Sequence, residues 1–245
     1  MTELPLVLLH AFPLDARMWD PVRAPLAERF RVITPDQRGL GRSPLPETEA
    51  EPDLADAARD VVALLDKLEL DQVVLGGCSM GGYLAMAVLR QAPERVGGLV
   101  LIDTKATADT PEAAQTRLDV ANRAEAEGVK GWLADGNLPN LLADTASADV
   151  RARVRELIDA QPPSGIAWAA RAMRNRPDSV DLLRETDVPA LVIVGERDAI
   201  TPLDAANTMV DALPDATLAV LPDAGHLTPL EDPAGVVEAI LGWVS

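Results

Sequence analysis

The chain has 245 residues, a length that fits one α/β domain with an insertion or two small domains. Hydrophobic residues make up 48% of the chain and aromatic residues only 3%, so we expect a largely aliphatic core. The formal net charge of −17 repels nucleic-acid phosphates and anionic lipid, which excludes both as expected partners.

The sequence offers little for disulfides, cysteine-based metal sites or membrane insertion. Cys78 is the only cysteine, so no intrachain disulfide can form. Residues 1–5 carry no basic region, and the apolar run after them is short, so we expect no signal peptide, no transmembrane span and a cytoplasmic location. We also expect neither a metal nor an organic cofactor. The pattern leaves both a monomer and a homodimer open.

Apolar runs alternate with helical patterns along the first hundred residues. Short continuous apolar runs predict buried parallel strands, and wider apolar spacing predicts helices. Strand–helix alternation indicates one mainly parallel sheet with helices on both faces. The predicted strands span residues 6–10, 30–34, 72–78 and 96–102, and the predicted helices span residues 16–29, 54–68 and 80–92.

The alternation stops after Asp103 and resumes at residue 190. Residues 104–186 show helical patterns without a clear strand, so we expect a helical lid inserted between the fourth and fifth strands. The lid would lie over the carboxyl edge of the sheet, where ligands bind in such folds. Residues 1–103 and 187–245 would form the core, with about six strands. Further strands are predicted at 190–195 and 217–221, further helices at 202–212 and 229–244, and breaks within the lid at Gly128, Gly136, Pro139, Pro162, Pro163 and Pro177.

The most informative motif follows the third predicted strand. Residues 77–81 read G-C-S-M-G and fit G-x-S-x-G, the nucleophile elbow, in which a serine occupies a sharp strand-to-helix turn. A side chain at Gly77 or Gly81 would clash where the chain passes close to itself, and Gly82 lets the helix pack tightly on the sheet. The turn exposes the Oγ of Ser79 near a helix N-terminus, which favours developing negative charge. The motif predicts Ser79 as a nucleophile.

A serine nucleophile needs a base, and the chain has two histidines. His226 lies on the loop after the sixth predicted strand, from which an imidazole can reach over the elbow. His10 ends the first strand at the same edge of the sheet and is the alternative. We predict His226 as the base.

The base in turn needs an acid that orients it. Asp198 follows the fifth predicted strand and precedes His226, which gives the chain order Ser, Asp, His. Asp103, after the fourth strand, is a rival acid, and Glu196 on the same loop as Asp198 is a weaker one. We predict Asp198 as the acid.

Two backbone N–H groups are expected to stabilise the oxyanion of the tetrahedral intermediate. One is the N–H of Met80, the residue after the nucleophile. The other is expected from the loop after the first strand, at Phe12. Tryptophans at helical spacing belong more often to the core than to a pocket, but three are candidates for lining the substrate pocket: Trp19, Trp132 and Trp168.

Together, the serine motif and the loops that carry the predicted histidine, aspartate and oxyanion donor resemble the α/β-hydrolase superfamily, in its lid-bearing branch of carboxylesterases, 3-oxoadipate enol-lactonases, haloperoxidases and carbon–carbon bond hydrolases. The resemblance covers nearly the whole chain. It departs from many members at Ala11, where they have glycine. The matching segments are residues 10–13, 36–43, 77–82, 195–202 and 225–226.

The resemblance implies Ser79 as nucleophile, Asp198 as acid, His226 as base, and Phe12 with Met80 as oxyanion donors. The function we predict is cleavage of a small carboxylic ester or lactone through an acyl-enzyme. One alternative is an enzyme like 3-oxoadipate enol-lactonase. Another is a cofactor-free haloperoxidase, perhydrolase or carbon–carbon bond hydrolase, and a third is a non-catalytic small-molecule binding protein on the same fold.

The lid is expected to decide between these substrates. An anionic substrate would need basic residues that face the pocket, and a buried arginine beneath the lid would indicate a substrate that bears a carboxylate. The lid candidates are Lys105, Arg117, Arg123 and Arg171.

Overall fold

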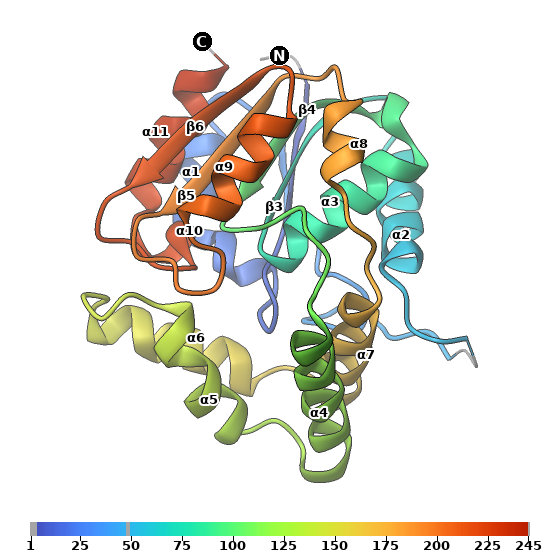
Figure 1. The fold of residues 1–245 in the computed structure, drawn as a ribbon, viewed down its shortest axis with the longest axis vertical. Coiled ribbons are helices and arrows are strands. Elements are labelled where there is room, and N and C mark those ends of the chain that lie inside the picture. Colours follow the sequence, from blue (N-terminus) through green and yellow to red (C-terminus); the bar gives the residue numbers. More distant parts are fainter. Residues whose placement is uncertain (1–3, 48–49, 245) are drawn as a thin grey trace.

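Six parallel strands form the centre of the computed structural model, which describes residues 4–47 and 50–244 (Figure 1). The strand order is β2-β1-β3-β4-β5-β6. The chain extends the sheet from β1 to β2 on one side and from β3 onward on the other, so the direction switches between β1 and β3. The strands are β1 (Leu6–Leu9), β2 (Val32–Ile33), β3 (Val73–Cys78), β4 (Val96–Ile102), β5 (Ala190–Gly195) and β6 (Ala216–Leu221).

Burial along the strands explains why they read as continuous apolar runs. Every residue of β1, β3 and β5 is buried, whereas most residues of the edge strand β6 remain partly accessible. Central strands of a parallel sheet are covered on both faces, so neither face favours polar side chains. The predicted fold class, an α/β fold with a mainly parallel sheet of about six strands, is confirmed.

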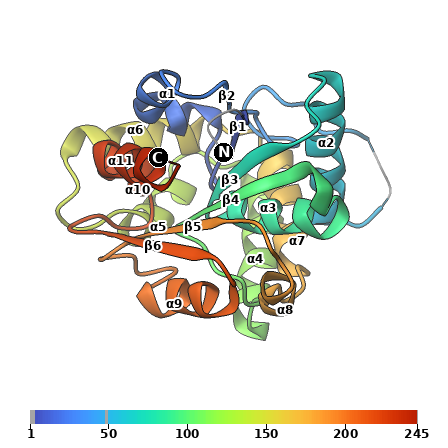
Figure 2. The ribbon, with the colours of Figure 1, turned by 90° about the horizontal axis from the view of Figure 1, so that it is seen from above.

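Helices cover both faces of the sheet (Figure 2). Helices α1 and α11 lie together on one face, while α2, α3, α8 and α9 lie on the other. Local signals set their ends: Asp53 caps α2 by accepting a hydrogen bond from the N–H of Ala55 at 2.8 Å. The helices are α1 (Asp20–Leu26), α2 (Leu54–Lys67), α3 (Met80–Gln91), α8 (Val180–Arg184), α9 (Leu203–Ala212), α10 (Thr228–Glu231) and α11 (Pro233–Trp243), with 3-10 turns at Ala16–Trp19 and Pro93–Arg95.

Four helices of the insertion stand apart from the sheet, beyond the carboxyl ends of its strands (Figure 1). They are α4 (Pro111–Glu127), α5 (Trp132–Leu141), α6 (Ala148–Asp159) and α7 (Pro163–Arg174). The fifth helix of the insertion, α8, packs against α9 at the side of the sheet. We refer to α4 to α7, the part of residues 104–186 that lies beyond the sheet, as the lid.

Two of the predicted helix breaks in the insertion are wrong. Helix α5 continues through both Gly136 and Pro139. Proline lacks the N–H that would bond back one turn, and glycine has low helix propensity, so local preference argues for a break. Tertiary packing overrides that preference because α5 buries Leu133, Leu138 and Leu141, and it packs against α6.

Gln161, just after α6, ties the lid to the core. Its side-chain amide donates to the Oδ2 of Asp15 at 2.8 Å, and its Oε1 accepts from the N–H of Gly41 at 2.9 Å. These bonds hold the lid against the loops after β1 and β2. The expectation of no signal peptide concerns residues 1–5, of which 1–3 lie outside the described residues. None of the described helices combines the length and hydropathy needed to cross a membrane.

Candidate active site

Ser79 occupies the sharp turn between β3 and α3. Its backbone has φ +53° and ψ −113°, a region that side-chain-bearing residues rarely adopt. The end of β4 and the residues after it hold this strained turn in place: the N–H of Ser79 donates to the carbonyl of Ile102 at 2.9 Å, and its carbonyl accepts from the hydroxyl of Thr104 at 2.8 Å. The side chain of Ser79 is therefore fixed at the carboxyl edge of the sheet.

The glycines around Ser79 are required by close approaches of the backbone. A Cβ on Gly77 would lie 2.1 Å from the carbonyl group of Gly81, and a Cβ on Gly81 would lie 2.0 Å from the carbonyl oxygen of Leu9. Both distances are far below van der Waals contact, and backbone atoms cannot rotate away as a side chain can. These two positions admit glycine alone without distortion of the turn.

Replacing Gly77 by alanine should lower the free energy of unfolding by about 3 kcal/mol or more, because β3 or α3 must move to admit the methyl group. Gly136 in α5 is the matched control, since a Cβ there meets no atom within 4 Å. Gly136→Ala should instead raise stability by about 0.5–1 kcal/mol through helix propensity. Thermal and urea unfolding of both variants measure this contrast. Equal stability of the two variants would contradict the packing.

His226 lies between Ser79 and Asp198. Its Nε2 is 2.8 Å from the Oγ of Ser79, and its Nδ1 is 2.8 Å from the Oδ2 of Asp198. The imidazole is buried, with only 1% of the side chain exposed. The structure thus brings together three side chains that lie up to 147 residues apart in the chain.

The turn after β5 prepares Asp198 for its contact with His226. The Oδ1 of Asp198 accepts from the N–H groups of Ile200 and Thr201, and its Oδ2 accepts from the hydroxyl of Thr201. Burial alone would raise the pKa of Asp198, but hydrogen bonding and charge from His226, with the Thr201 donors, outweigh it and lower the pKa. The carboxylate is therefore ionised at neutral pH.

An ionised Asp198 fixes the tautomer of His226. A carboxylate can only accept a hydrogen bond, so Nδ1 of His226 carries the proton, and this N–H donates a hydrogen bond to Asp198. The Nε2 atom is then free to accept the hydrogen bond from the hydroxyl of Ser79. This is the protonation state in which an imidazole can remove a proton from a serine.

The alternative base, His10, is occupied elsewhere. Its Nε2 accepts from the N–H of Gln37 at 2.9 Å, and its Nδ1 lies 3.1 Å from the carbonyl of Ala11. Burial lowers the pKa of His10 and keeps it neutral. Both ring nitrogens serve the packing of the loops after β1 and β2, so His10 has a structural role.

The rival acid, Asp103, lies in the same buried region but is hydrogen-bonded to residues other than His226. Its Oδ1 accepts from the N–H of Gly195, and its Oδ2 accepts from the N–H and hydroxyl of Thr228. Burial, followed by the charge of Asp198, raises the pKa of Asp103 well above its ordinary range. Asp103 thus holds Thr228, two residues after His226, in position through two hydrogen bonds. The weaker rival, Glu196, is exposed.

Glu231 in α10 is a site-supporting residue that the sequence patterns did not reveal. Its Oε1 accepts from the N–H groups of Gly225 and Leu227, on either side of His226, and its Oε2 accepts from the N–H of Ala143 beyond α5. Glu231 therefore couples residues 222–227, the histidine loop that carries His226, to the lid. No local motif marks such a residue, because its partners come from two distant segments.

Phe12 and Met80 lie at the carboxyl ends of β1 and β3, on the two sides of the switch in chain direction. Met80 is the first residue of α3, so its N–H has no carbonyl one turn earlier in the helix. Among residues 4–47 and 50–244, no hydrogen bond from the N–H of either Phe12 or Met80 to another protein group is found. Two donors are therefore available near Ser79.

A cavity of about 170 Å³ between core and lid contains Ser79 and His226. Apart from these two, the lining residues that the structure describes are mainly apolar and include the charged Arg117 but no Asp or Glu. A cavity of this kind accommodates a small molecule with an ester group next to the serine. The other lining residues are Phe12, Tyr83, Thr116, Val120, Asn137, Leu141, Ala170, Met173 and Ile200.

The three tryptophans proposed for the pocket lie outside this lining. Trp19 is fully buried in the core. The indole N–H of Trp132 donates to the carbonyl of Gly128, and its ring stacks against the guanidinium of Arg123 at 4.2 Å. Trp168 lines a different depression, together with Leu45 and Pro52. Their helical spacing did not show which way these side chains point.

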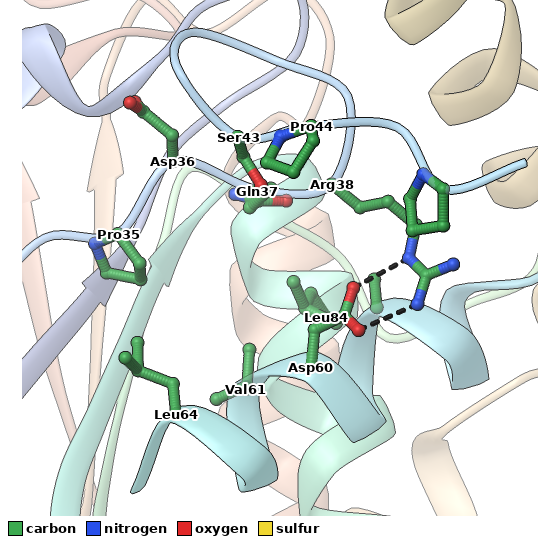
Figure 3. Close-up of a pocket in the computed structure, with 12 residues that line it drawn as sticks. Pro35, Asp36, Gln37, Arg38, Ser43, Pro44, Asp60, Val61, Leu64 and Leu84 are labelled. Carbon is green, nitrogen blue, oxygen red and sulfur yellow. Dashed lines mark hydrogen bonds and ion pairs between the residues drawn. The ribbon is translucent and has the colours of Figure 1, made fainter. Parts of the chain in front are cut away.

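A second cavity, of about 290 Å³, lies between the 35–46 loop and α2 (Figure 3). Arg38 and Asp60, which both line it, form a bidentate salt bridge, with nitrogen–oxygen distances of 2.6 and 2.7 Å. This cavity contains neither Ser79 nor His226. We therefore place the candidate active site in the cavity beneath the lid and not in this one.

Comparisons with known proteins agree with this architecture. A solved thermophilic esterase from Thermogutta terrifontis is 42% identical, with a TM-score of 0.94 over 98% of this chain and 89% of that one. A solved enol-lactonase from Burkholderia xenovorans LB400 is 27% identical, with a TM-score of 0.86 over 99% of this chain and 92% of that one.

A curated relative from Pseudomonas putida, the dihydrolipoyllysine-residue acetyltransferase component of an acetoin cleaving system, is 31% identical over 98% of this chain. The chain spans only 63% of that relative's length. A family model described as the alpha/beta hydrolase fold matches residues 5–233. The match covers most of the sequence and agrees with the parallel sheet, so the chain belongs to the alpha/beta hydrolase fold family.

Proposed function

We propose that the chain cleaves a small carboxylic ester or lactone, with Ser79, His226 and Asp198 as its catalytic triad. The observation that carries the proposal is the continuous chain of hydrogen bonds, 2.8 Å from Ser79 to His226 and 2.8 Å from His226 to Asp198. The similarity to a solved esterase and a solved enol-lactonase supports ester and lactone bonds as the substrate class.

The proposed reaction begins when the Oγ of Ser79 attacks the substrate carbonyl carbon. His226 takes the hydroxyl proton at Nε2 as the new carbon–oxygen bond forms. Asp198 stabilises the imidazolium because it is ionised and bonded to Nδ1–H. The carbonyl oxygen becomes an oxyanion, to which the N–H groups of Phe12 and Met80 donate; each such donor lowers the barrier by about 3–4 kcal/mol.

Collapse of the tetrahedral intermediate breaks the ester bond. The leaving alkoxide takes the proton from His226, which leaves an acyl group on Ser79. A water molecule then gives a proton to Nε2 of His226 and attacks the acyl carbon. The second tetrahedral intermediate collapses, the bond between the acyl carbon and Oγ breaks, and His226 returns the proton to Ser79 as the acid leaves. For a lactone, acid and alcohol remain in one product molecule.

A fluorophosphonate probe tests whether Ser79 is an activated nucleophile. The probe should add one phosphonyl group to Ser79, detected by mass spectrometry of the peptide, because the base that activates the serine is within hydrogen-bonding distance. Labelling should disappear in His226→Ala. A folded wild-type protein that the probe leaves unlabelled would favour the alternative of a non-catalytic binding protein.

A further inference from the structure

Three cations converge on one buried carboxylate at the edge of the active-site cavity. The Oδ1 of Asp109 lies 2.8 Å from Nη1 of Arg176 and 3.5 Å from Nζ of Lys105, and its Oδ2 accepts from Nε of Arg117. Only 1% of the Asp109 side chain is exposed. We call these four residues the Asp109 cluster.

The Asp109 cluster carries more positive than negative charge. Burial alone would raise the pKa of Asp109, but Arg117 and then Arg176 outweigh it and lower the pKa, so the carboxylate is ionised. One negative charge then faces two arginine cations and Lys105, whose pKa is lowered by burial and by Arg176, so positive charge exceeds negative charge within the cluster. Such an excess stands out in a chain with a net charge of −17. It creates a local potential that attracts anions.

Within the Asp109 cluster, Arg117 is the member that reaches the cavity of Ser79. It lines that cavity from α4, and 22% of its side chain is exposed. Its Nη1 lies 3.3 Å from the Sδ of Met173, and a thioether sulfur is only a weak acceptor. The guanidinium edge that faces Met173 thus retains capacity for a stronger acceptor.

Arg176 holds the cluster together and is not free to bind a ligand. Its guanidinium stacks on the ring of Tyr83 at 3.9 Å, and it donates to the carbonyls of Thr107 and Met173 as well as to Asp109. Since Tyr83 lines the cavity of Ser79, this stack forms part of the cavity wall. The arrangement fixes Asp109, and Asp109 in turn orients Arg117 through Nε.

We propose that the ester or lactone substrate carries a carboxylate group that Arg117 binds at the lid side of the cavity. This inference rests on the proposed function of the Ser79 site and names its substrate class. Guanidinium–carboxylate pairs form charge-assisted hydrogen bonds that neutral groups do not match. The described residues of the lining include no Asp or Glu that would repel the anion, and Asp109 holds Arg117 at Nε while Nη1 lies against Met173, another lining residue.

Two matched pairs of chromogenic or phenolic esters test the substrate charge. The first is mono-p-nitrophenyl glutarate against p-nitrophenyl pentanoate, which places the carboxylate on the acyl side. The second is 4-acetoxybenzoate against its methyl ester, which places it on the alcohol side. The anionic member of at least one pair should have a kcat/KM at least about tenfold higher in the wild type, a factor that one good charged contact can supply.

The preference should depend on Arg117 and not on lid charge in general. Arg117→Gln should bring the anionic-to-neutral ratio of kcat/KM to within about threefold of unity, and Arg117→Lys should give an intermediate ratio because it keeps the charge without the planar fork. Arg123→Gln is the matched control: Arg123 also lies on α4, pairs with Glu127 and is absent from the cavity lining, so the ratio should not change.

A binding measurement separates this inference from the proposed function. Calorimetry should detect binding of glutarate to the Ser79→Ala variant and its loss in Ser79→Ala combined with Arg117→Gln. Absence of any anionic preference in the wild type, or an equal fall for both members of each pair in Arg117→Gln, would overturn the inference while esterase activity remains. Turnover that survives in Ser79→Ala would overturn the proposed function, and glutarate binding through Arg117 would then still stand.

Discussion

Replacing Ser79 by alanine should lower kcat for p-nitrophenyl acetate by about 10⁶-fold, the scale seen when a serine hydrolase loses its nucleophile. The variant removes the only hydroxyl that donates to Nε2 of His226 among the described residues, so no acyl-enzyme can form. The fold should persist, because alanine fits the same backbone turn and the bonds that hold the turn use the main chain. Steady-state hydrolysis and thermal unfolding measure both outcomes.

Ser164→Ala is the matched control for this experiment. Ser164 is exposed on α7, in the same lid that covers the cavity, and it lies outside the cavity lining. Its replacement should leave the hydrolysis rate within about twofold of the wild type, as expected for a surface change away from the site. A Ser79→Ala protein that retains the wild-type rate would exclude the proposed acyl-enzyme route.

Replacing Asp198 by asparagine should lower kcat by about 10⁴-fold, because the amide favours the wrong tautomer of the histidine. Asparagine can donate to Nδ1 of His226, which places the imidazole proton on Nε2, where it faces Ser79. The histidine can then no longer accept the serine proton. The same ester assay, with circular dichroism to verify folding, measures this loss.

Asp103→Asn is the comparison that tests the choice of acid. Asp103 is hydrogen-bonded to Gly195 and Thr228 and not to His226, and in asparagine the amide NH2 would have to face one of the two backbone N–H groups from which its oxygens now accept hydrogen bonds. This variant should lose less than about tenfold in kcat, mostly through a less well-held histidine loop. If Asp103→Asn is inactive and Asp198→Asn is nearly fully active, the assignment of the acid is wrong.

The elements that the sequence predicted well are those in which local and tertiary preferences agree. The bounds of β4 and β5 match the predicted strands 96–102 and 190–195 because central strands are apolar at every position and end at polar or glycine residues. Helix α5 shows the opposite case. Gly136 and Pro139 oppose a helix locally, and only burial of the α5 leucines against neighbouring elements decides for it.

The candidate site also has features that local sequence preferences predict and features that only the fold decides. The sequence determined that Ser79 lies on a strained turn, because glycines at fixed spacing are a local requirement of that turn. It also brought Asp198 and His226 to the same sheet edge as Ser79, since parallel strands share their carboxyl edge. Only the tertiary structure decided that Asp198 and not Asp103 meets the imidazole, because both aspartates follow strands of the same sheet.

The contacts that the lid helices make are decided almost entirely by the tertiary structure. Amphipathic spacing determined that residues 104–186 are helical, but helical periodicity defines a face and not what the face meets. The three tryptophans therefore lie outside the cavity, while Arg117 lies in its lining and Glu231 joins the lid to the histidine loop. Such contacts join segments far apart in the chain, and their geometry exists only once the helices have packed.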